Sequence, residues 1–190
     1  MKIINKGNGA GGAKTNHNGI KFQDKTDNEN ILLENGYTKK YIKDTKKQYY
    51  LSKEYDDKTI TFFKQNNVVK YMKIKYNIVL FNNPDEAYLI EYKNGRKVLK
   101  VLEKKNQNVE GSVEEKLLSG SNFKRCYEKS LGIKFEVVYG YCVSKFLQNK
   151  LTSDTIKYKI WNEIFMEDNI KVLFGDDENY FETLDKWIYA

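Results

Sequence analysis

The clearest hydrophobic pattern lies in the middle of the chain, where two apolar segments flank a short turn. Residues 87–92 are mostly aromatic and aliphatic and predict a β-strand. Asn94 followed by Gly95 is the strongest short-range signal for a β-hairpin, so the chain is expected to turn back there. A second strand, antiparallel to the first, should follow.

Polar groups end the apolar face of this second strand. Side chains alternate with a period of two along a strand, so the apolar Leu99 and Val101 are followed on the same face by polar residues. These polar residues are Glu103, Lys105 and Gln107. The pattern predicts a functional site where the buried face of this strand ends, with all three as candidate catalytic residues.

The rest of the chain alternates between predicted helices and strands. Two segments leave alternatives open: 37–58 is a pair of strands or an exposed loop, and 68–76 is a short basic helix or a strand. Ser112, with Glu115 three residues later, has the spacing of a capping box that opens a helix. The other predictions are a helix from residue 20 to a stop at Gly36, strands over 59–64, 134–143 and 170–174, and helices over 153–168 and 180–188. This order indicates an α/β three-layer domain with a mixed central β-sheet flanked by helices.

Length and composition favour one domain. A chain of 190 residues can bury a sizeable core, and no proline-rich or serine-rich linker divides it. Residues 1–19 are expected to be a Gly/Asn-rich N-terminal arm, in which 5–19 form no regular element, and 20–190 a single domain. The sequence contains no apolar run long enough to predict a membrane span or a secretory signal. We therefore expect a soluble, intracellular protein with no membrane partner. The glycine-rich start lacks the preceding strand of a dinucleotide or P-loop cradle, so no nucleotide cofactor is expected.

The charge suits a polyanionic partner. The formal net charge is +7, and lysines that neutralise phosphates release counterions from nucleic acid. Asparagine, lysine and exposed backbone amides in the arm can meet phosphates or base edges. The candidate DNA contacts are Lys14, Asn16, His17 and Asn18 in the arm and Lys70 and Lys73 in segment 68–76.

An acid at the start of the first strand completes a possible site for phosphodiester hydrolysis. Two carboxylates can hold Mg²⁺, and an adjacent lysine can orient or help to deprotonate the attacking water. Glu103 and Lys105 supply one acid and the lysine, and the hairpin register decides the second acid. A two-residue loop places Glu86 opposite Glu103, whereas a three-residue loop or a bulge places Asp85 there.

These residues resemble the PD-(D/E)XK nuclease superfamily, with Pro84-Asp85 before the hairpin and Glu103-Lys104-Lys105 after it. The similarity is closer to one branch of restriction endonucleases, in which a Gly-Ala-Gly-Gly-Ala start (9–13), a PDEAY strand (84–88) and an EKKNQNVEGSVE segment (103–114) occur together. It extends over most of the chain. The resemblance implies a restriction-endonuclease-like fold and a Mg²⁺-dependent endonuclease acting on double-stranded DNA as a homodimer. It favours Asp85 as the first metal ligand and leaves Glu86 as the reserve candidate.

One residue departs from the pattern of that branch. A glutamate is expected directly after Phe22, but the chain has Gln23, so Asp24 or Glu29 replaces this third acid or the acid is not essential. A rival motif formed by Glu91 and Lys93 is rejected, because six strand residues at about 3.3 Å each place Glu91 roughly 20 Å from Asp85. The alternative functions are a structure-specific nuclease such as a Holliday junction resolvase and a DNA-binding module without catalysis.

Overall fold

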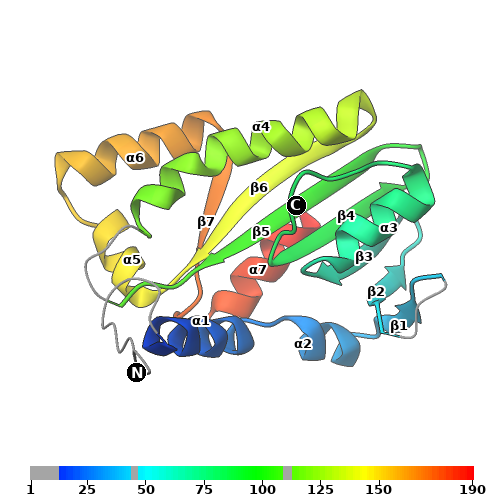
Figure 1. Ribbon diagram of the computed structural model, residues 1–190, viewed down its shortest axis with the longest axis horizontal. Helices are drawn as coiled ribbons and strands as arrows, with labels where there is room; N and C mark the ends of the chain where they lie inside the picture. The colour runs from blue at the N-terminus through cyan, green and yellow to red at the C-terminus, as the bar shows by residue number, and fades with distance from the viewer. Residues whose placement is uncertain (1–12, 44–46, 109–112) are drawn as a thin grey trace, which may run out of the picture.

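A seven-stranded sheet with the strand order β1-β2-β3-β4-β5-β6-β7 forms the centre of the computed structural model (Figure 1). The structure describes the main chain from residue 13 and the side chains from residue 19, apart from 44–46 and 109–112. Strands β1 to β5 pair antiparallel in sequence order, and β5, β6 and β7 pair parallel, so the sheet is mixed. The strands are β1 (Thr38–Tyr41), β2 (Tyr49–Glu54), β3 (Lys58–Lys64), β4 (Glu86–Tyr92), β5 (Lys97–Lys105), β6 (Glu136–Val143) and β7 (Ile170–Phe174).

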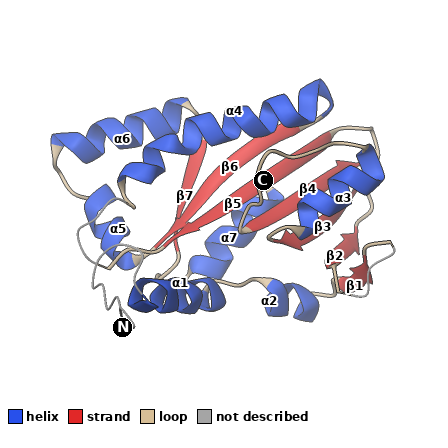
Figure 2. Cartoon of the chain, viewed as in Figure 1, coloured by secondary structure: helices blue, strands red, loops and turns tan. Residues whose placement is uncertain are grey.

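Helices cover both faces of this sheet (Figure 2). Side chains of α3, α4, α5 and α6 join the hydrophobic core on one face, and those of α1, α2 and α7 join the core on the other. The α-helices are α1 (Ala13–Lys25), α2 (Glu29–Glu34), α3 (Asn67–Tyr76), α4 (Gly120–Leu131), α5 (Lys145–Leu151), α6 (Ile156–Glu167) and α7 (Tyr180–Tyr189), with 3₁₀ turns at Glu115–Ser119 and Gly132–Lys134. The described helices include none with the length and apolar character needed to cross a membrane.

The alternation of side chains along the central hairpin assigns each residue to one of the two cores. Leu89 and Leu99 are buried in the core beneath α3 and α4. Ile90 and Leu102 are buried in the core beneath α1 and α7. Residues that continue these two series past the ends of the strands must therefore lie on opposite faces of the sheet.

Most elements expected from the hydrophobic pattern are present. The hairpin is formed by β4 and β5, the segment 37–58 contains the pair of strands β1 and β2, and 68–76 belongs to helix α3. The helix α5 was missed, and the expected helix from residue 20 to Gly36 is two helices separated by residues 26–28. Glu115 begins a 3₁₀ turn, whereas its expected capping partner Ser112 lies outside the described residues.

Helix α1 begins at Ala13, inside the segment that was expected to be an arm. The prediction that residues 5–19 lack regular structure is therefore wrong for 13–19. The glycine-rich run ends at Gly12, and α1 gains a tertiary anchor from Phe22, which is buried in the core shared with α7. Packing of this kind overrides weak local helix propensity. Residues 1–12 lie outside the described part of the chain.

A close approach at Gly175 brings α1 against the sheet. The backbone N–H of Gly175 donates to the carbonyl oxygen of Val143 at 2.9 Å. A Cβ atom at Gly175 would lie 2.6 Å from the Sγ atom of Cys142 and 2.7 Å from the Cζ atom of Phe22. Only a residue without a side chain fits between the sheet and α1 at this position.

We therefore expect Gly175→Ala to lower the free energy of unfolding by about 1–3 kcal/mol, as overpacking of a filled core does. The matched control is Gly19→Ala in α1, where a Cβ would meet nothing within 4 Å. Because alanine is the better helix former, this control should stabilise the protein by up to about 1 kcal/mol. Urea unfolding of both variants checks the prediction, and equal effects would show that α1 is not packed against Gly175.

Candidate active site

The register of the central hairpin decides which acid faces Glu103. The N–H of Tyr92 donates to the carbonyl oxygen of Arg96, and the N–H of Gly95 donates to that of Tyr92, each at 2.9 Å. Residues 93–95 therefore form a three-residue loop. Its last residue has a φ angle of +92°, which favours glycine.

This register pairs Glu86 with Leu102, and one further step along it brings Asp85 opposite Glu103. The two-residue alternative, in which Glu86 faces Glu103, is excluded. Asp85 and Glu103 continue the series of alternating residues buried beneath α3 and α4, so they share one face of the sheet. The hairpin thus brings the carboxyl groups of Asp85 and Glu103 together at the end of an apolar stem, in the register that a three-residue loop requires.

Two hydrogen bonds orient the carboxyl group of Asp85. Its Oδ2 atom accepts a hydrogen bond from the backbone N–H of Lys104 at 2.7 Å. Its Oδ1 atom accepts a longer bond of 3.3 Å from the side-chain amide of Gln23 on α1. Strand β5 and helix α1 therefore both hold this acid.

Glu103 and Lys105 form an ion pair on the same face. The Nζ atom of Lys105 lies 2.9 Å from the Oε2 atom of Glu103, and the two side chains are 22% and 13% exposed. Burial raises the pKa of Glu103 above its ordinary value; the charge of Lys105 acts against this shift, and the charge of Asp85 adds to it. The negative charge of Asp85 therefore acts on the carboxyl group of Glu103 across the hairpin.

The neighbouring residues Glu86 and Lys104 form a buried ion pair on the opposite face, beneath α1. Their Oε1 and Nζ atoms are 2.5 Å apart, and the two side chains are 1% and 3% exposed. The Nζ atom of Lys104 also donates to the carbonyl oxygen of Thr26, just past the end of α1, at 3.0 Å. Glu86, the reserve metal ligand, therefore belongs to the packing of α1 and shares no site with Glu103.

Gln107 does not continue the face of Glu103 and Lys105, because β5 ends at Lys105. Its backbone N–H donates to the Oγ atom of Ser144 at 3.1 Å, and the Ser144 hydroxyl donates to the carbonyl oxygen of Gln107 at 2.8 Å. Side chains alternate between the two faces only within the strand, so the expected grouping of Gln107 with Glu103 does not extend past Lys105. The structure gives Gln107 a role in holding the end of β5 against the start of α5.

Of the candidates for a third acid position, Gln23 is the one that contacts Asp85. Asp24 lines a cavity of about 80 Å³ together with Asp85 and Glu86. Glu29 is engaged elsewhere, with the Nζ atom of Lys39 at 3.1 Å and the hydroxyl of Tyr49 at 2.8 Å. Within the described ranges no group of three or more Asp, Glu, His or Cys side chains could hold a metal ion.

The oxygen ligands available at the site suit Mg²⁺ bound together with water and substrate. Mg²⁺ takes oxygen ligands, is commonly bound through one or two carboxylates and keeps several of its waters. Asp85 and Glu103 supply two carboxylates on neighbouring strands, and Gln23 adds an amide group beside the first. These residues suit a hard cation bound with substrate and water, and they do not form a closed all-protein cage.

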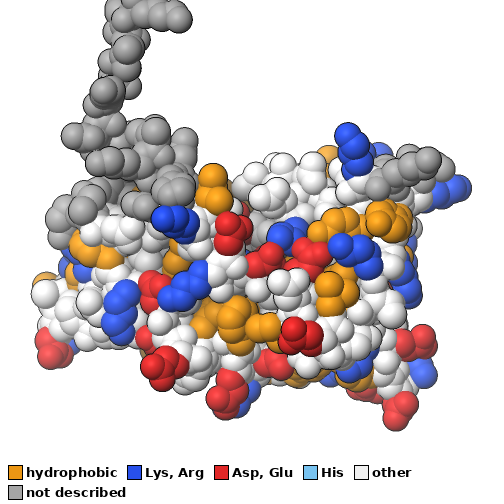
Figure 3. Space-filling model, turned by 90° about the horizontal axis from the view of Figure 1, so that it is seen from below, with side chains coloured by type: hydrophobic (Ala, Val, Ile, Leu, Met, Phe, Trp, Pro, Cys, Tyr) orange, Lys and Arg blue, Asp and Glu red, His pale blue; other side chains and the backbone are white. Residues whose placement is uncertain are grey.

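A cleft of about 480 Å³ lies beside these residues, between α1 and the end of β5. Gln23, Lys105 and Lys116 are among the residues that line it. Seen from the side of α1 and α2, acidic and basic side chains are mixed on the described surface (Figure 3). The cleft borders the two acids through Gln23, which contacts Asp85, and Lys105, which contacts Glu103, and the described part of this view is not a uniformly basic face.

The expected DNA contacts fall in two places. Lys70 and Lys73 are exposed on α3, and the ammonium group of Lys73 donates to the side chain of Asn77 at 2.8 Å. The four arm candidates lie in the first two turns of α1, where the structure describes the main chain and not the side chains. These four are Lys14, Asn16, His17 and Asn18.

Glu91, which formed the rejected motif, lies at the far end of β4 from Asp85. It pairs across the hairpin with Lys97. Its carboxylate lies 2.8 Å from the Nζ atom of Lys75 and accepts a hydrogen bond from the hydroxyl of Tyr76. This carboxylate is a link between α3 and the sheet.

Sequence reasoning did not assign a role to Lys104. The same alternation that placed Glu103 and Lys105 on one face required Lys104 to point to the other face, and that signal was present in the sequence. Its partners Glu86 and Thr26 could not be inferred, because they depend on where α1 packs.

Comparison with protein-family models, with curated proteins and with solved structures finds no match to this chain.

The raised pKa of Glu103 leads to a stability prediction. A carboxyl group whose pKa is raised on folding stabilises the protein fully below its unfolded pKa, and this contribution is lost as the pH rises through the folded pKa. Glu103→Gln removes the buried charge and its repulsion with Asp85. We expect this variant to be at least as stable as the wild type at about pH 8. At about pH 5 the stability of the wild type relative to the variant should be higher than at about pH 8.

Thermal unfolding at the two pH values measures this effect. The matched control is Glu54→Gln, which replaces an exposed glutamate at the end of β2 and should give no pH-dependent difference. A Glu103→Gln variant that is much less stable than the wild type at the higher pH would show that the ion pair with Lys105 supports the fold.

Proposed function

We propose that this protein is a Mg²⁺-dependent endonuclease that hydrolyses phosphodiester bonds in double-stranded DNA, with the sequence selectivity of a type II restriction enzyme. The observation that carries the proposal is the arrangement of Asp85 opposite Glu103, with Lys105 bonded to Glu103. A restriction-endonuclease-like fold is part of the proposal. It is supported by the antiparallel hairpin β4–β5, the crossover through α4 and the parallel strand β6.

Each residue has a distinct role in this proposal. Asp85 and Glu103 would hold Mg²⁺, which when bound offsets the negative charge that develops on the phosphate and lowers the pKa of bound water. Gln23 and the backbone N–H of Lys104 hold the carboxylate of Asp85 in position. The ammonium group of Lys105, already at the site, can orient the attacking water and donate to a phosphate oxygen.

The substrate is inferred from charge and from the residues beside the cleft. The net charge of +7 and the presence of Lys105 and Lys116 in the lining of one cleft suit a polyanion. The N-terminal candidates Lys14, Asn16 and Asn18 lie in the first two turns of α1, the helix that carries Gln23. A homodimer is included in the proposal, because cutting both strands of a palindrome matches two-fold symmetry.

The test is to incubate the purified protein with Mg²⁺ and either linear duplex DNA or a four-way junction, and to map the ends. A restriction enzyme gains selectivity from base-edge contacts, each good bidentate pair being worth about 1–3 kcal/mol. We therefore expect discrete fragments from linear DNA, 5′-phosphate ends and the same short sequence at every cut.

Two outcomes would contradict this proposal. Cleavage of the junction in preference to every linear duplex, regardless of sequence, would assign the site to a structure-specific nuclease such as a Holliday junction resolvase. Tight DNA binding with no cleavage of either substrate would assign the chain to DNA-binding modules without catalysis.

A further inference from the structure

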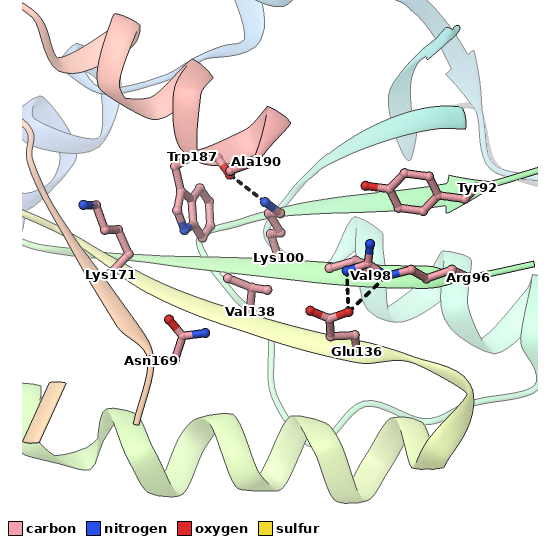
Figure 4. Close-up of a pocket in the computed structure, with 10 residues that line it drawn as sticks. All are labelled: Tyr92, Arg96, Val98, Lys100, Glu136, Val138, Asn169, Lys171, Trp187 and Ala190. Atoms are coloured by element: carbon pink, nitrogen blue, oxygen red, sulfur yellow. Dashed lines mark hydrogen bonds and ion pairs between the residues drawn. The ribbon is translucent and has the colours of Figure 1, made fainter. Parts of the chain in front are cut away.

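A second pocket lies away from the acids, toward the hairpin turn, between the end of α7 and the sheet (Figure 4). Its volume is about 240 Å³. It combines three cationic side chains with aromatic walls and an apolar floor formed by Val98 and Val138. The cationic and aromatic residues are Arg96, Lys100, Lys171, Tyr92 and Trp187.

Lys100 is the unusual residue in this pocket. It lies in the middle of β5 and is only 5% exposed. Its Nζ atom donates to the backbone carbonyl oxygen of Trp187 at 2.6 Å and lies 5.6 Å from the centroid of the Trp187 rings. Among the described residues it forms no ion pair with a carboxylate. A buried ammonium group without a counter-ion is costly, and buried charges are normally paired.

The surrounding charges do not compensate Lys100. Burial lowers its pKa, Glu136 acts against this shift, and Lys58 and Arg96 add to it. The carboxylate of Glu136 is taken by Arg96, whose Nη2 and Nε atoms lie 2.7 and 3.2 Å from its Oε2 atom. Lys171 adds an exposed cation at the rim. The local excess of charge is therefore positive.

Trp187 gives a second, independent indication of a ligand. The residue is 7% exposed, and its indole Nε1–H has no hydrogen-bond acceptor in the described part of the chain. Indole N–H groups usually find an acceptor when buried. Figure 4 shows the ring beside Lys100 and Val138, so a flat apolar group in the pocket would meet an aromatic surface close to the ammonium group of Lys100.

We propose that this pocket binds a small organic anion, in which a phosphate or carboxylate group pairs with Lys100 and a flat apolar body packs against Trp187. Such a ligand would supply the missing counter-charge to the buried amine and fill the apolar part of the cavity. Convergent polar groups in a mostly apolar concave site are the usual features of a small-molecule site. The proposal does not depend on the nuclease function, because none of these residues contacts Asp85, Glu103 or Lys105 through a described hydrogen bond or ion pair.

The test is calorimetric titration of the full chain with phenyl phosphate and with benzoate, which separate the two acid groups. Inorganic phosphate probes binding of the charged group of the ligand alone, and phenol probes binding of the aromatic ring alone. We expect at least one of the two aromatic anions to bind about tenfold or more tightly than inorganic phosphate or phenol. Lys100→Met should abolish that binding while leaving the unliganded protein at least as stable as the wild type.

The matched control is Lys97→Met, which removes a lysine from the same strand but outside this pocket. It should bind the aromatic anion like the wild type. If Lys100→Met fails to fold, Trp187→Phe tests the same contact by removing the indole N–H, and affinity should fall. The proposal is overturned if neither aromatic anion binds the wild type, or if Lys100→Met or a folded Trp187→Phe binds it equally well. Unchanged DNA cleavage by Lys100→Met would keep the two functions distinct.

Discussion

Asp85→Asn and Glu103→Gln are each expected to reduce the rate of DNA cleavage by about 10²-fold or more, the loss that follows removal of one preorganised charged group from an active site. Each substitution keeps the shape of the side chain and removes one of the two facing carboxylates. The affinity for DNA should change little, because neither acid is a cationic contact to phosphate. Single-turnover cleavage and a separate binding titration without Mg²⁺ measure the two effects.

Glu91→Gln is the matched control for this prediction. It replaces an acid on the same strand as the hairpin site, at the end far from Asp85, where the partners are Lys75 and Tyr76. Cleavage by this control should remain within about threefold of the wild type, since general acid–base and metal-binding groups are untouched. Wild-type cleavage by Asp85→Asn or by Glu103→Gln would show that the assigned site is wrong.

Lys104→Met is expected to lower the free energy of unfolding by about 3–5 kcal/mol, the cost of removing one partner from a buried ion pair. The substitution leaves Glu86 buried without its counter-ion and leaves the carbonyl oxygen of Thr26 without the Lys104 donor. Urea unfolding measures the loss. The matched control is Lys64→Met, whose partner Asp27 is 2.5 Å away but whose side chain is 36% exposed, so the expected loss is about 0–1 kcal/mol.

The loss in Lys104→Met should also depend on pH. Burial raises the pKa of Glu86, and Lys104 is the main group that opposes this shift. Without the lysine the folded pKa rises further above the unfolded value, so stability is retained at low pH and lost as the pH rises through the folded pKa. The deficit should be smaller at about pH 5 than at about pH 8. A small, pH-independent deficit would show that the pair is not essential for docking α1.

The hydrophobic pattern predicted much of the α/β architecture because the long elements have strong periodicity. The hairpin and strand β7 were located directly, since each is apolar and bounded by turn residues. The short helix α5 was missed, because seven residues give too few turns for a periodic signal. The start of α1 was missed because its helical state depends on packing of Phe22.

The candidate site was only partly predictable for a different reason. Alternation along β5 placed Glu103 and Lys105 on one face, and this required no knowledge of the fold. The choice between Asp85 and Glu86 depended on whether Asn94-Gly95 belongs to a two-residue or a three-residue loop, and the same dipeptide is compatible with both. The contact between Gln23 and Asp85 joins residues that are far apart in the sequence, so it required the three-dimensional structure.

The proposed reaction requires Asp85 and Glu103 to bind a divalent cation together. Mn²⁺ can replace Mg²⁺ at oxygen-ligand sites and is detected by electron paramagnetic resonance, so binding is measured without any cleavage assay. We expect one bound Mn²⁺ per chain in the wild type in the presence of duplex DNA, loss of binding in Asp85→Asn and unchanged binding in Glu91→Gln. Mn²⁺ bound equally well by the wild type and by Asp85→Asn would contradict this requirement.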